Sequence, residues 1–336
     1  MQRIKYYLGR LLHIDYKSFF KAVDEIAKRS HKSRIFIFFD IIRCSILFGS
    51  GYVDYKLFYF EDVKDELKKT YVTRTINNDY FKLFNNREYY KYFNDKDKFL
   101  EKFKDFTNRD FINIKIHTYE EYLEFVKKHS SFMAKPVDQS GGYGVEKIKT
   151  DKNTDLKALY DVFMEHKQYL LEELVEQVDF MNKLYPCAVN TIRLVTVRYK
   201  EKTHIVCSVI RIGNNGNAVD NFHSEGMFST LDENGIINKP AMDRSTNLFT
   251  VHPYTNTPIL GFKVENYDEL IEFVTKASEV VPEVGYVGWD VAISTKGPVL
   301  IEGNHLPGYD VYQSKIHLND DGTGKKPVFD KIIYGE

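Results

Sequence analysis

The chain has 336 residues, about twice the length of a typical single domain, which predicts two or three packed subdomains. Its 47 Lys and Arg against 48 Asp and Glu give a net charge of −1, which argues against a dedicated nucleic-acid binder. A local basic pocket for a small anion stays compatible with this balance. Three widely spaced cysteines, Cys44, Cys187 and Cys207, indicate neither a disulfide framework nor a zinc site, so we expect a reduced, cytoplasmic compartment.

We expect neither a secretory signal nor a membrane-spanning segment in the N-terminal region. Residues 1–10 are basic but no clean apolar stretch follows them. The most apolar run, residues 35–49, is interrupted by Asp40 and Arg43 and is too short to span a bilayer. We interpret it as a buried helix. The alternative is a segment peripheral to the inner face of the membrane, because basic residues surround it; they are Arg3, Lys5, Arg10, Lys28, Arg29, Lys32 and Arg34.

Three zones follow one another, and together they predict an α+β protein. Residues 1–92 contain no proline and read as a mainly helical region. Residues 93–170 predict a small α+β subdomain with helices at 96–106, 119–129 and 155–165 and strands at 111–116, 131–136 and 145–148. Residues 171–336 predict a larger subdomain. Its expected strands lie at 169–175, 191–199, 204–212, 288–294 and 299–302, with a helix at 268–280.

A glycine-rich turn at residues 141–144 follows the predicted strand that carries Lys135. Glycines let successive backbone N–H groups approach an anion, so the turn is a candidate phosphate cradle with Lys135 in reach. The turn matches neither a Walker A loop nor a dinucleotide-binding fingerprint. A plain hairpin loop beside an exposed lysine is the alternative.

A predicted hairpin at residues 288–304 carries three oxygen donors. A three-residue turn centred on Lys296 places Asp290 directly opposite Glu302, and Asn304 lies on the same face. Such oxygen ligands suit a Mg²⁺ ion that keeps some of its waters and binds substrate phosphates. A solvent-exposed polar face is the alternative, but the apolar flanking residues favour burial.

Two further predicted strands each contain one arginine, Arg193 and Arg211, among apolar neighbours. An arginine in such a place pairs with a carboxylate, a phosphate or an aromatic face. We interpret both as clamps on phosphoryl oxygens or on a substrate carboxylate, with a structural ion pair as the alternative. The long polar loop at residues 213–226 is typical of segments that close over a substrate.

The order of these features resembles the ATP-grasp superfamily, and most of all its sugar-transfer-associated family, which is linked to bacterial cell-surface polysaccharide genes. The resemblance runs from about residue 52 to about residue 313. It rests on these stretches: Asp95–Phe99, Ala134–Pro136 with Gly141–Gly144, Leu170–Leu174, Asn190–Arg193, Arg211–Gly213 with Val219–Asn221, and Gly288–Asp290 with Ile301–Asn304. One departure is Glu225-Gly226, where the family pattern has a glycine pair.

The resemblance implies an ATP-grasp fold, with two α+β subdomains gripping ATP, and a role for each matched residue. Lys96, with Lys98 as its alternative, and Lys135 would hold ATP phosphates together with Ser140, Gly141, Gly142 and Gly144. The adenine edge would meet Glu172, Glu173, Leu174 and Val175, and Glu176 or Asp179 would hold the ribose. Asp290, Glu302 and Asn304 would bind one or two Mg²⁺ ions. Arg193, Arg211 and Lys135 would act in catalysis, and Asn190, Asp220, Asn221 and His223 would contact the substrate.

The implied function is an ATP- and Mg²⁺-dependent carboxylate–amine ligase acting on small molecules. It would join an amino acid or amine to a sugar acid or amino sugar through an acyl phosphate. A kinase acting on a hydroxyl and a non-catalytic ATP-binding assembly module are the alternatives. The sequence leaves a homodimer open.

Overall fold

The computed structural model describes residues 15–137, 144–217, 219–220 and 225–335. The chain divides into two compact units, one of Met1–Leu83 with Gly308–Glu336 and one of Phe84–Pro307. The sequence zones had boundaries at residues 92 and 170 and kept residues 171–336 together. The C-terminal residues instead pack with the N-terminal helices: Gln313 exchanges two side-chain hydrogen bonds with the backbone of Val72, and Tyr80 stacks on Phe329 with ring centroids 4.2 Å apart.

The N-terminal unit is helical, as the sequence predicted. Its elements are α2 (Tyr16–Ser30), α3 (Arg34–Phe48), α4 (Tyr52–Leu57), α5 (Asp65–Lys68), the greater part of α6 (Arg74–Phe84), a 3₁₀ turn η3 (Val311–Gln313) and α14 (Lys326–Tyr334). Asp15 and Ser33 cap α2 and α3 by accepting hydrogen bonds from backbone N–H groups of the first turn. The interpretation of residues 35–49 as a buried helix is only partly right, because Ile35 and Phe39 of α3 are 72% and 63% exposed.

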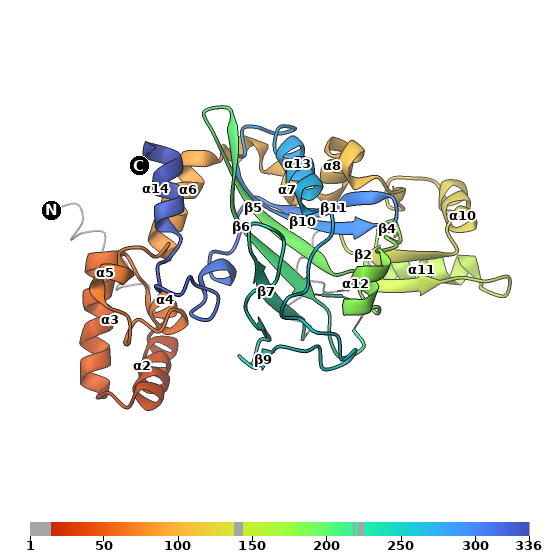
Figure 1. Cartoon of the computed structure of the whole chain (residues 1–336). Coiled ribbons are helices and arrows are strands. Elements are labelled where there is room, and N and C mark those ends of the chain that lie inside the picture. The colour runs from red at the N-terminus through yellow and green to blue at the C-terminus, as the bar shows by residue number, and fades with distance from the viewer. Residues whose placement is uncertain (1–14, 138–143, 218, 221–224, 336) are drawn as a thin grey trace. The chain divides into compact units, whose positions relative to one another are not determined.

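The second unit starts with short helical segments and a four-stranded antiparallel sheet. The segments are η1 (Arg87–Tyr89), α7 (Lys91–Asn94), α8 (Lys96–Lys102) and α9 (Lys104–Thr107). The sheet has the order β1-β4-β2-β3, from β1 (Phe111–Asn113), β2 (Ser131–Lys135), β3 (Glu146–Lys149) and β4 (Leu170–Glu173). Helices α10 (Tyr119–Lys128) and α11 (Leu156–His166) pack against it through a shared apolar core (Figure 1).

A seven-stranded antiparallel sheet forms the rest of this unit, in the order β11-β10-β5-β6-β7-β8-β9. Its strands are β5 (Thr191–Tyr199), β6 (Lys202–Ile212), β7 (Met227–Leu231), β8 (Ala241–Met242), β9 (Leu248–Phe249), β10 (Tyr286–Ser294) and β11 (Gly297–Asn304). Helices α12 (Asp179–Leu184) and α13 (Tyr267–Ala277) share its apolar core (Figure 1). β10 is buried along nearly its whole length, and the indole N–H of Trp289 donates to Thr196 Oγ1 at 2.9 Å.

Local sequence signals account for most element boundaries. Thr118 forms the capping box of α10 with Glu121, as expected from its place before the helix. The helix expected at 96–106 is instead two helices that meet at Phe103. The strand expected at 111–116 ends at Asn113, because the Asn113 side chain accepts a hydrogen bond from the backbone of Lys115 and turns the chain. The strands β7 to β9 and helix α12 were missed.

The hairpin of β10 and β11 pairs Asp290 with Glu302, as predicted, but its turn and its strand register differ from the prediction. Ser294 pairs with Gly297, so the turn has two central residues and not three, and Gly297 adopts a φ of 101° that suits glycine. A bulge on β11, with Ile301 as the extra residue, shifts the register by one between Asp290 and Val291. The bulge thus restores the pairing that the longer turn would have produced.

None of the helices in the described ranges combines the length and the apolar character that crossing a bilayer requires.

Candidate functional site

A pocket of about 440 Å³ lies within the unit Phe84–Pro307, at the ends of strands from both sheets. Many of the residues singled out in the sequence line it, from segments far apart in the chain. They are Lys96, Lys135, Glu172, Glu173, Leu174, Val175, Arg211, Asp220, Asp290, Glu302 and Asn304. Ammonium, guanidinium and carboxylate groups therefore share one partly apolar recess, a combination suited to an anionic ligand.

Asp290 is held by two guanidinium groups at the base of this pocket. Arg193 donates from Nε to Oδ1 at 2.7 Å and from Nη2 to Oδ2 at 2.6 Å, and Arg211 donates from Nη1 to Oδ2 at 2.8 Å. Burial acts to raise the pKa of Asp290, but the two arginines outweigh it and hold that pKa below its usual value. Arg193 and Arg211 therefore form the structural ion pairs that the sequence left open as an alternative. Arg193 itself does not line the pocket.

Glu302 and Asn304 supply the oxygen donors that stay available for a cation. No described residue donates a hydrogen bond to the Glu302 carboxylate, and its pKa is raised by burial and then by the charge of Asp290. A carboxylate in such surroundings gains from a nearby divalent cation. Asp290 already accepts three hydrogen bonds of the roughly four that a carboxylate can accept, which leaves one lone pair on Oδ1. The donor set therefore fits Mg²⁺, chiefly through Glu302 and Asn304.

Asp220 lines the pocket and contacts Thr191 at the start of β5. Its Oδ2 accepts hydrogen bonds from the backbone N–H of Thr191, at 2.9 Å, and from the Thr191 hydroxyl, while Arg211 lies 3.6 Å from Oδ1. Burial raises the pKa of Asp220 even though Arg211 and Thr191 act to lower it. This carboxylate orients Arg211 and anchors the loop that the sequence marked as a substrate lid.

A second buried ion cluster lies on the four-stranded sheet. Glu172 contacts Lys135 Nζ at 2.6 Å through Oε1 and Arg109 Nε at 2.7 Å through Oε2. Burial acts to raise the pKa of Glu172, but the charges of Arg109 and Lys135 lower it to about 2. Two cations against one anion leave a surplus positive charge on this wall of the pocket. The ion pair with Glu172 holds Lys135 in place on this wall.

Arg109 was missed in the sequence because it belongs to no glycine-rich or strand motif. Its guanidinium joins the two sheets: besides Glu172 on β4, it donates to the backbone carbonyls of Leu300 and Ile301 on β11. Those carbonyls lie at the bulge next to Glu302. Arg109 lies shortly before β1, but only the structure shows that β1 pairs with β4 and brings this arginine to Glu172.

Lys96 reaches the pocket from the first turn of α8. Its Nζ donates to the carbonyl of Pro136 at 2.7 Å, which ties the helix to the segment that follows β2. Its alternative, Lys98, is exposed and pairs with Asp95 at 2.8 Å, outside the pocket lining. Of these two lysines, only Lys96 lines the pocket.

Several predicted site residues lie elsewhere. Glu176 and Asp179 do not line the pocket, and neither does Gly144, whose carbonyl accepts a hydrogen bond from Gln168. Asn190 is fully buried, and its amide bonds to Gln177, Met181, Tyr185 and Gly213, so it braces the start of β5 and is not open to a substrate. Ser140, Gly141, Gly142, Asn221 and His223 lie outside the described residues.

The charge on Glu172 gives a testable dependence of stability on pH. Because its pKa falls from 4.5 in the unfolded chain to about 2 in the folded one, it stabilises the fold above pH 4.5, and this contribution is lost as the pH falls toward 2. We expect Glu172→Gln to remove about 3 kcal/mol of pH-dependent stability over that window. Urea unfolding at pH 7, 5, 4 and 3 measures it. Glu272→Gln, an exposed control, should leave the slope unchanged, and equal slopes for Glu172→Gln and the parent would contradict the assignment.

Asp110, His129 and Glu173 form a second cluster with one ligand atom each within 4.8 Å of one another. Both carboxylates already have lysine partners, since Lys128 pairs with Asp110 and Lys296 with Glu173 at 3.0 Å. The cluster is therefore an ion-pair network, and of its three members only Glu173 also lines the pocket.

Comparison with known proteins places this geometry in context. A family model described as sugar-transfer associated ATP-grasp matches residues 75–317. No curated protein matches. Among solved structures, the ATP-grasp ligase PsnB complexed with a minimal precursor aligns at 11% identity over 75% of this chain and 64% of that one, with a TM-score of 0.43.

Two further solved structures are similar at the same level. D-alanyl-alanine synthetase A from Vibrio cholerae aligns at 14% identity over 73% of this chain and 65% of that one, with a TM-score of 0.44. The VanG D-Ala:D-Ser ligase from Enterococcus faecalis aligns at 13% identity over 71% and 60%, with a TM-score of 0.46. The chain thus spans less than two thirds of the length of each of these three proteins.

Proposed function

Because the chain belongs to the sugar-transfer associated ATP-grasp family, we propose that it is an ATP- and Mg²⁺-dependent carboxylate–amine ligase. The observation that carries the proposal is the pocket itself, where Lys96, Lys135 and Arg211 face the oxygen donors Glu302 and Asn304. The family's association with sugar transfer supports a sugar acid or amino sugar as one partner, and we propose an amino acid or amine as the other. The product would serve cell-surface polysaccharide synthesis in the cytoplasm.

The proposed reaction has two steps. The substrate carboxylate attacks the γ-phosphorus of ATP, which forms an acyl phosphate and releases ADP. The amine then attacks the acyl carbon, phosphate leaves, and the nitrogen loses a proton to give the amide. Lys96, Lys135 and Arg211 hold phosphoryl oxygens throughout, so the protein contributes position and charge.

Mg²⁺, held by Glu302 and Asn304 with Asp290 beside them, would neutralise phosphate charge when it is bound. Arg193 and Asp220 are positioning residues in this proposal, because each contacts other residues of the site and not the substrate. Arg193 holds Asp290, and Asp220 holds both Arg211 and the start of β5. Each keeps a pocket group in one rotamer, which is what positional catalysis requires.

The test is an ADP-release screen of paired amines and sugar acids with ATP and Mg²⁺, followed by product analysis. We expect free phosphate and an amide in equal amounts. A phosphorylated acceptor would indicate the kinase alternative, and nucleotide binding without ADP release under every pair would indicate an assembly module. Either result would overturn the ligase.

Lys135→Met serves as the impaired variant in that screen. Glu172 keeps its partner Arg109, so the variant should fold, yet it lacks one phosphate contact and should lose about a hundredfold in kcat/KM for ATP. Lys128→Met is the matched control, because Lys128 is 67% exposed and pairs with Asp110 at the surface. Equal activity of the two variants would show that Lys135 does not contact the phosphates.

A further inference from the structure

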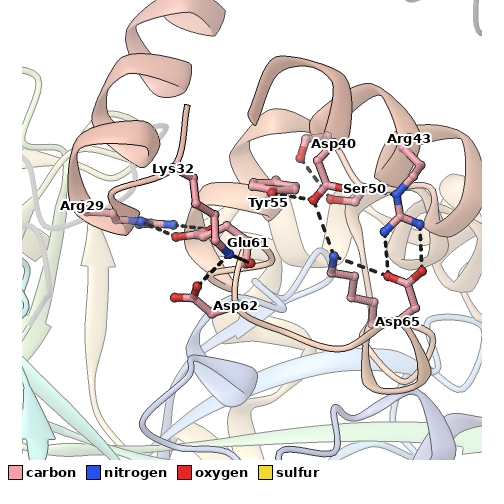
Figure 2. Close-up of polar contacts among 11 residues, drawn as sticks. Arg29, Lys32, Asp40, Arg43, Ser50, Tyr55, Glu61, Asp62 and Asp65 are labelled. Atoms are coloured by element: carbon pink, nitrogen blue, oxygen red, sulfur yellow. Dashed lines mark hydrogen bonds and ion pairs between the residues drawn. The ribbon is translucent and has the colours of Figure 1, made fainter. Parts of the chain in front are cut away.

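The helix α3 in the N-terminal unit carries three charged residues, of which Asp40 is buried while Arg34 and Arg43 are 67% and 43% exposed. Asp40 is buried, its Oδ2 accepts a hydrogen bond from the Tyr55 hydroxyl at 2.7 Å, and Lys68 Nζ lies 3.7 Å away (Figure 2). Arg43 donates to Asp40 at 2.9 Å and pairs in bidentate fashion with Asp65 at 2.7 and 2.8 Å (Figure 2). The polar groups of α3 are thus satisfied within the unit.

The face of α3 that points away from its buried apolar residues is mainly apolar and exposed. Ile35, Phe39 and Ile46 are 72%, 63% and 57% exposed, and their spacing of four and seven residues places them on one stripe along the whole helix. On α2, Tyr16 and Phe20 continue the patch, since Phe20 stacks on Phe38 of α3 with centroids 6.2 Å apart. We call these five exposed side chains, Tyr16, Phe20, Ile35, Phe39 and Ile46, the apolar face.

Exposed lysines border the apolar face. Lys17, Lys21 and Lys28 share one exposed side of α2, at spacings of four and seven residues, next to Tyr16 and Phe20. Lys21 lies 4.0 Å from Glu25, and Arg29 and Lys32 are paired with Glu61 and Asp62 (Figure 2). The apolar stripe and the basic stripe therefore run side by side.

Charge is distributed unevenly along the chain. Residues 1–48 contain ten Lys and Arg against four Asp and Glu, a net charge of +6. Because the whole chain carries −1, the remaining residues carry −7. The region that contains the apolar face is therefore the basic part of an otherwise acidic protein, which matches an anionic partner.

We propose that the apolar face docks on an anionic lipid bilayer, with α2 and α3 lying in the plane of the interface. Phe39 and Ile46 enter the boundary between headgroups and acyl chains, and Lys17, Lys21 and Lys28 contact lipid phosphates. With 15 residues, α3 is about 22 Å long, too short to span the bilayer, so it lies on the surface. A second copy of the chain fits less well, because a self-complementary interface would bring the two lysine rims together.

The test uses the full chain with Phe39→Trp as a reporter. The natural Trp289 is 1% exposed and gives a constant background, while Trp at position 39 should emit as a solvent-exposed indole in buffer. Vesicles of phosphatidylcholine with phosphatidylglycerol should shift its emission to the blue, and vesicles of phosphatidylcholine alone should shift it at least tenfold less at equal lipid. A shifted emission already in buffer would show that protein covers the face and would overturn the proposal.

Vesicle flotation compares two matched variants. Ile46→Glu should lower the bound fraction of the full chain about tenfold, whereas Ile116→Glu, which changes a 70% exposed isoleucine in the other unit, should leave it unchanged. Lys17→Glu with Lys21→Glu should abolish the preference for phosphatidylglycerol. Equal flotation of both isoleucine variants, or a concentration-dependent dimer that Ile46→Glu disperses without any flotation of the parent, would overturn lipid docking.

Discussion

Replacing Asp290 by asparagine should lower the free energy of unfolding of the unliganded protein by about 3–5 kcal/mol. The side chain of Asp290 is 4% exposed, and its carboxylate is the shared partner of Arg193 and Arg211. An asparagine of the same size keeps the shape but leaves two guanidinium groups without their anion in a buried place. Urea unfolding at pH 7, without nucleotide or magnesium, measures the loss.

Asp110→Asn is the matched control for this substitution. Asp110 also pairs with cations, Lys128 and His129, but it is 45% exposed, so its ion pairs should contribute less than about 1 kcal/mol. If the two substitutions lowered the free energy of unfolding equally, Asp290 would not hold the arginines together. The contrast also separates a structural role of Asp290 from metal binding, because the measurement is made without metal.

The order of motifs predicted the fold and most of the pocket, because each motif is local. A strand followed by a glycine-rich turn, or a hairpin with a carboxylate on each arm, is read from a few adjacent residues. The pairing of Asp290 with Glu302 was predicted correctly from a turn of the wrong length. The bulge at Ile301 compensated for the turn. Its carbonyl and that of Leu300 accept hydrogen bonds from Arg109, about 190 residues earlier in the chain, and such a long-range contact leaves no local pattern in the sequence.

The partners of the charged residues could not be predicted in the same way. The sequence indicated that Arg193 and Arg211 pair with a carboxylate, a phosphate or an aromatic face. It left the partner open, since Asp290 lies 97 and 79 residues away from them. The sequence suggested that Asn190 contacts the substrate. In the structure, its amide nitrogen and oxygen are both hydrogen-bonded to neighbouring backbone groups at the start of β5. Long-range contacts of this kind depend on how the sheets assemble, which residue spacing does not show.

The helix α3 shows a related limit. Its hydrophobic residues lie on all sides, and such a pattern is typical of a helix buried on every face. In the structure, Asp40 takes one of the buried positions because Tyr55, Arg43 and Lys68 satisfy it, and apolar residues are left outside. The hydrophobic pattern alone therefore did not show which face of this helix is exposed.

Glu302→Gln should leave the stability of the unliganded protein unchanged or slightly raised while it removes most of the proposed ligase activity. Burial and the charge of Asp290 raise the pKa of Glu302, so the ionised form is already unfavourable in the fold, and a neutral amide removes that cost. The same change deletes the carboxylate that fits Mg²⁺ best, and we expect ADP release to fall about a thousandfold.

Thermal unfolding separates these two effects. Adding Mg²⁺ and ATP should raise the Tm of the parent, because a ligand that binds only the folded state stabilises it, and should raise that of Glu302→Gln much less. Glu272→Gln, whose carboxylate is 67% exposed and pairs with Lys276, should behave as the parent. A full Tm increase in Glu302→Gln would place the metal elsewhere. A large loss of Tm without any ligand would mean instead that Glu302 acts, like Asp290, as a counter-ion of the buried arginines.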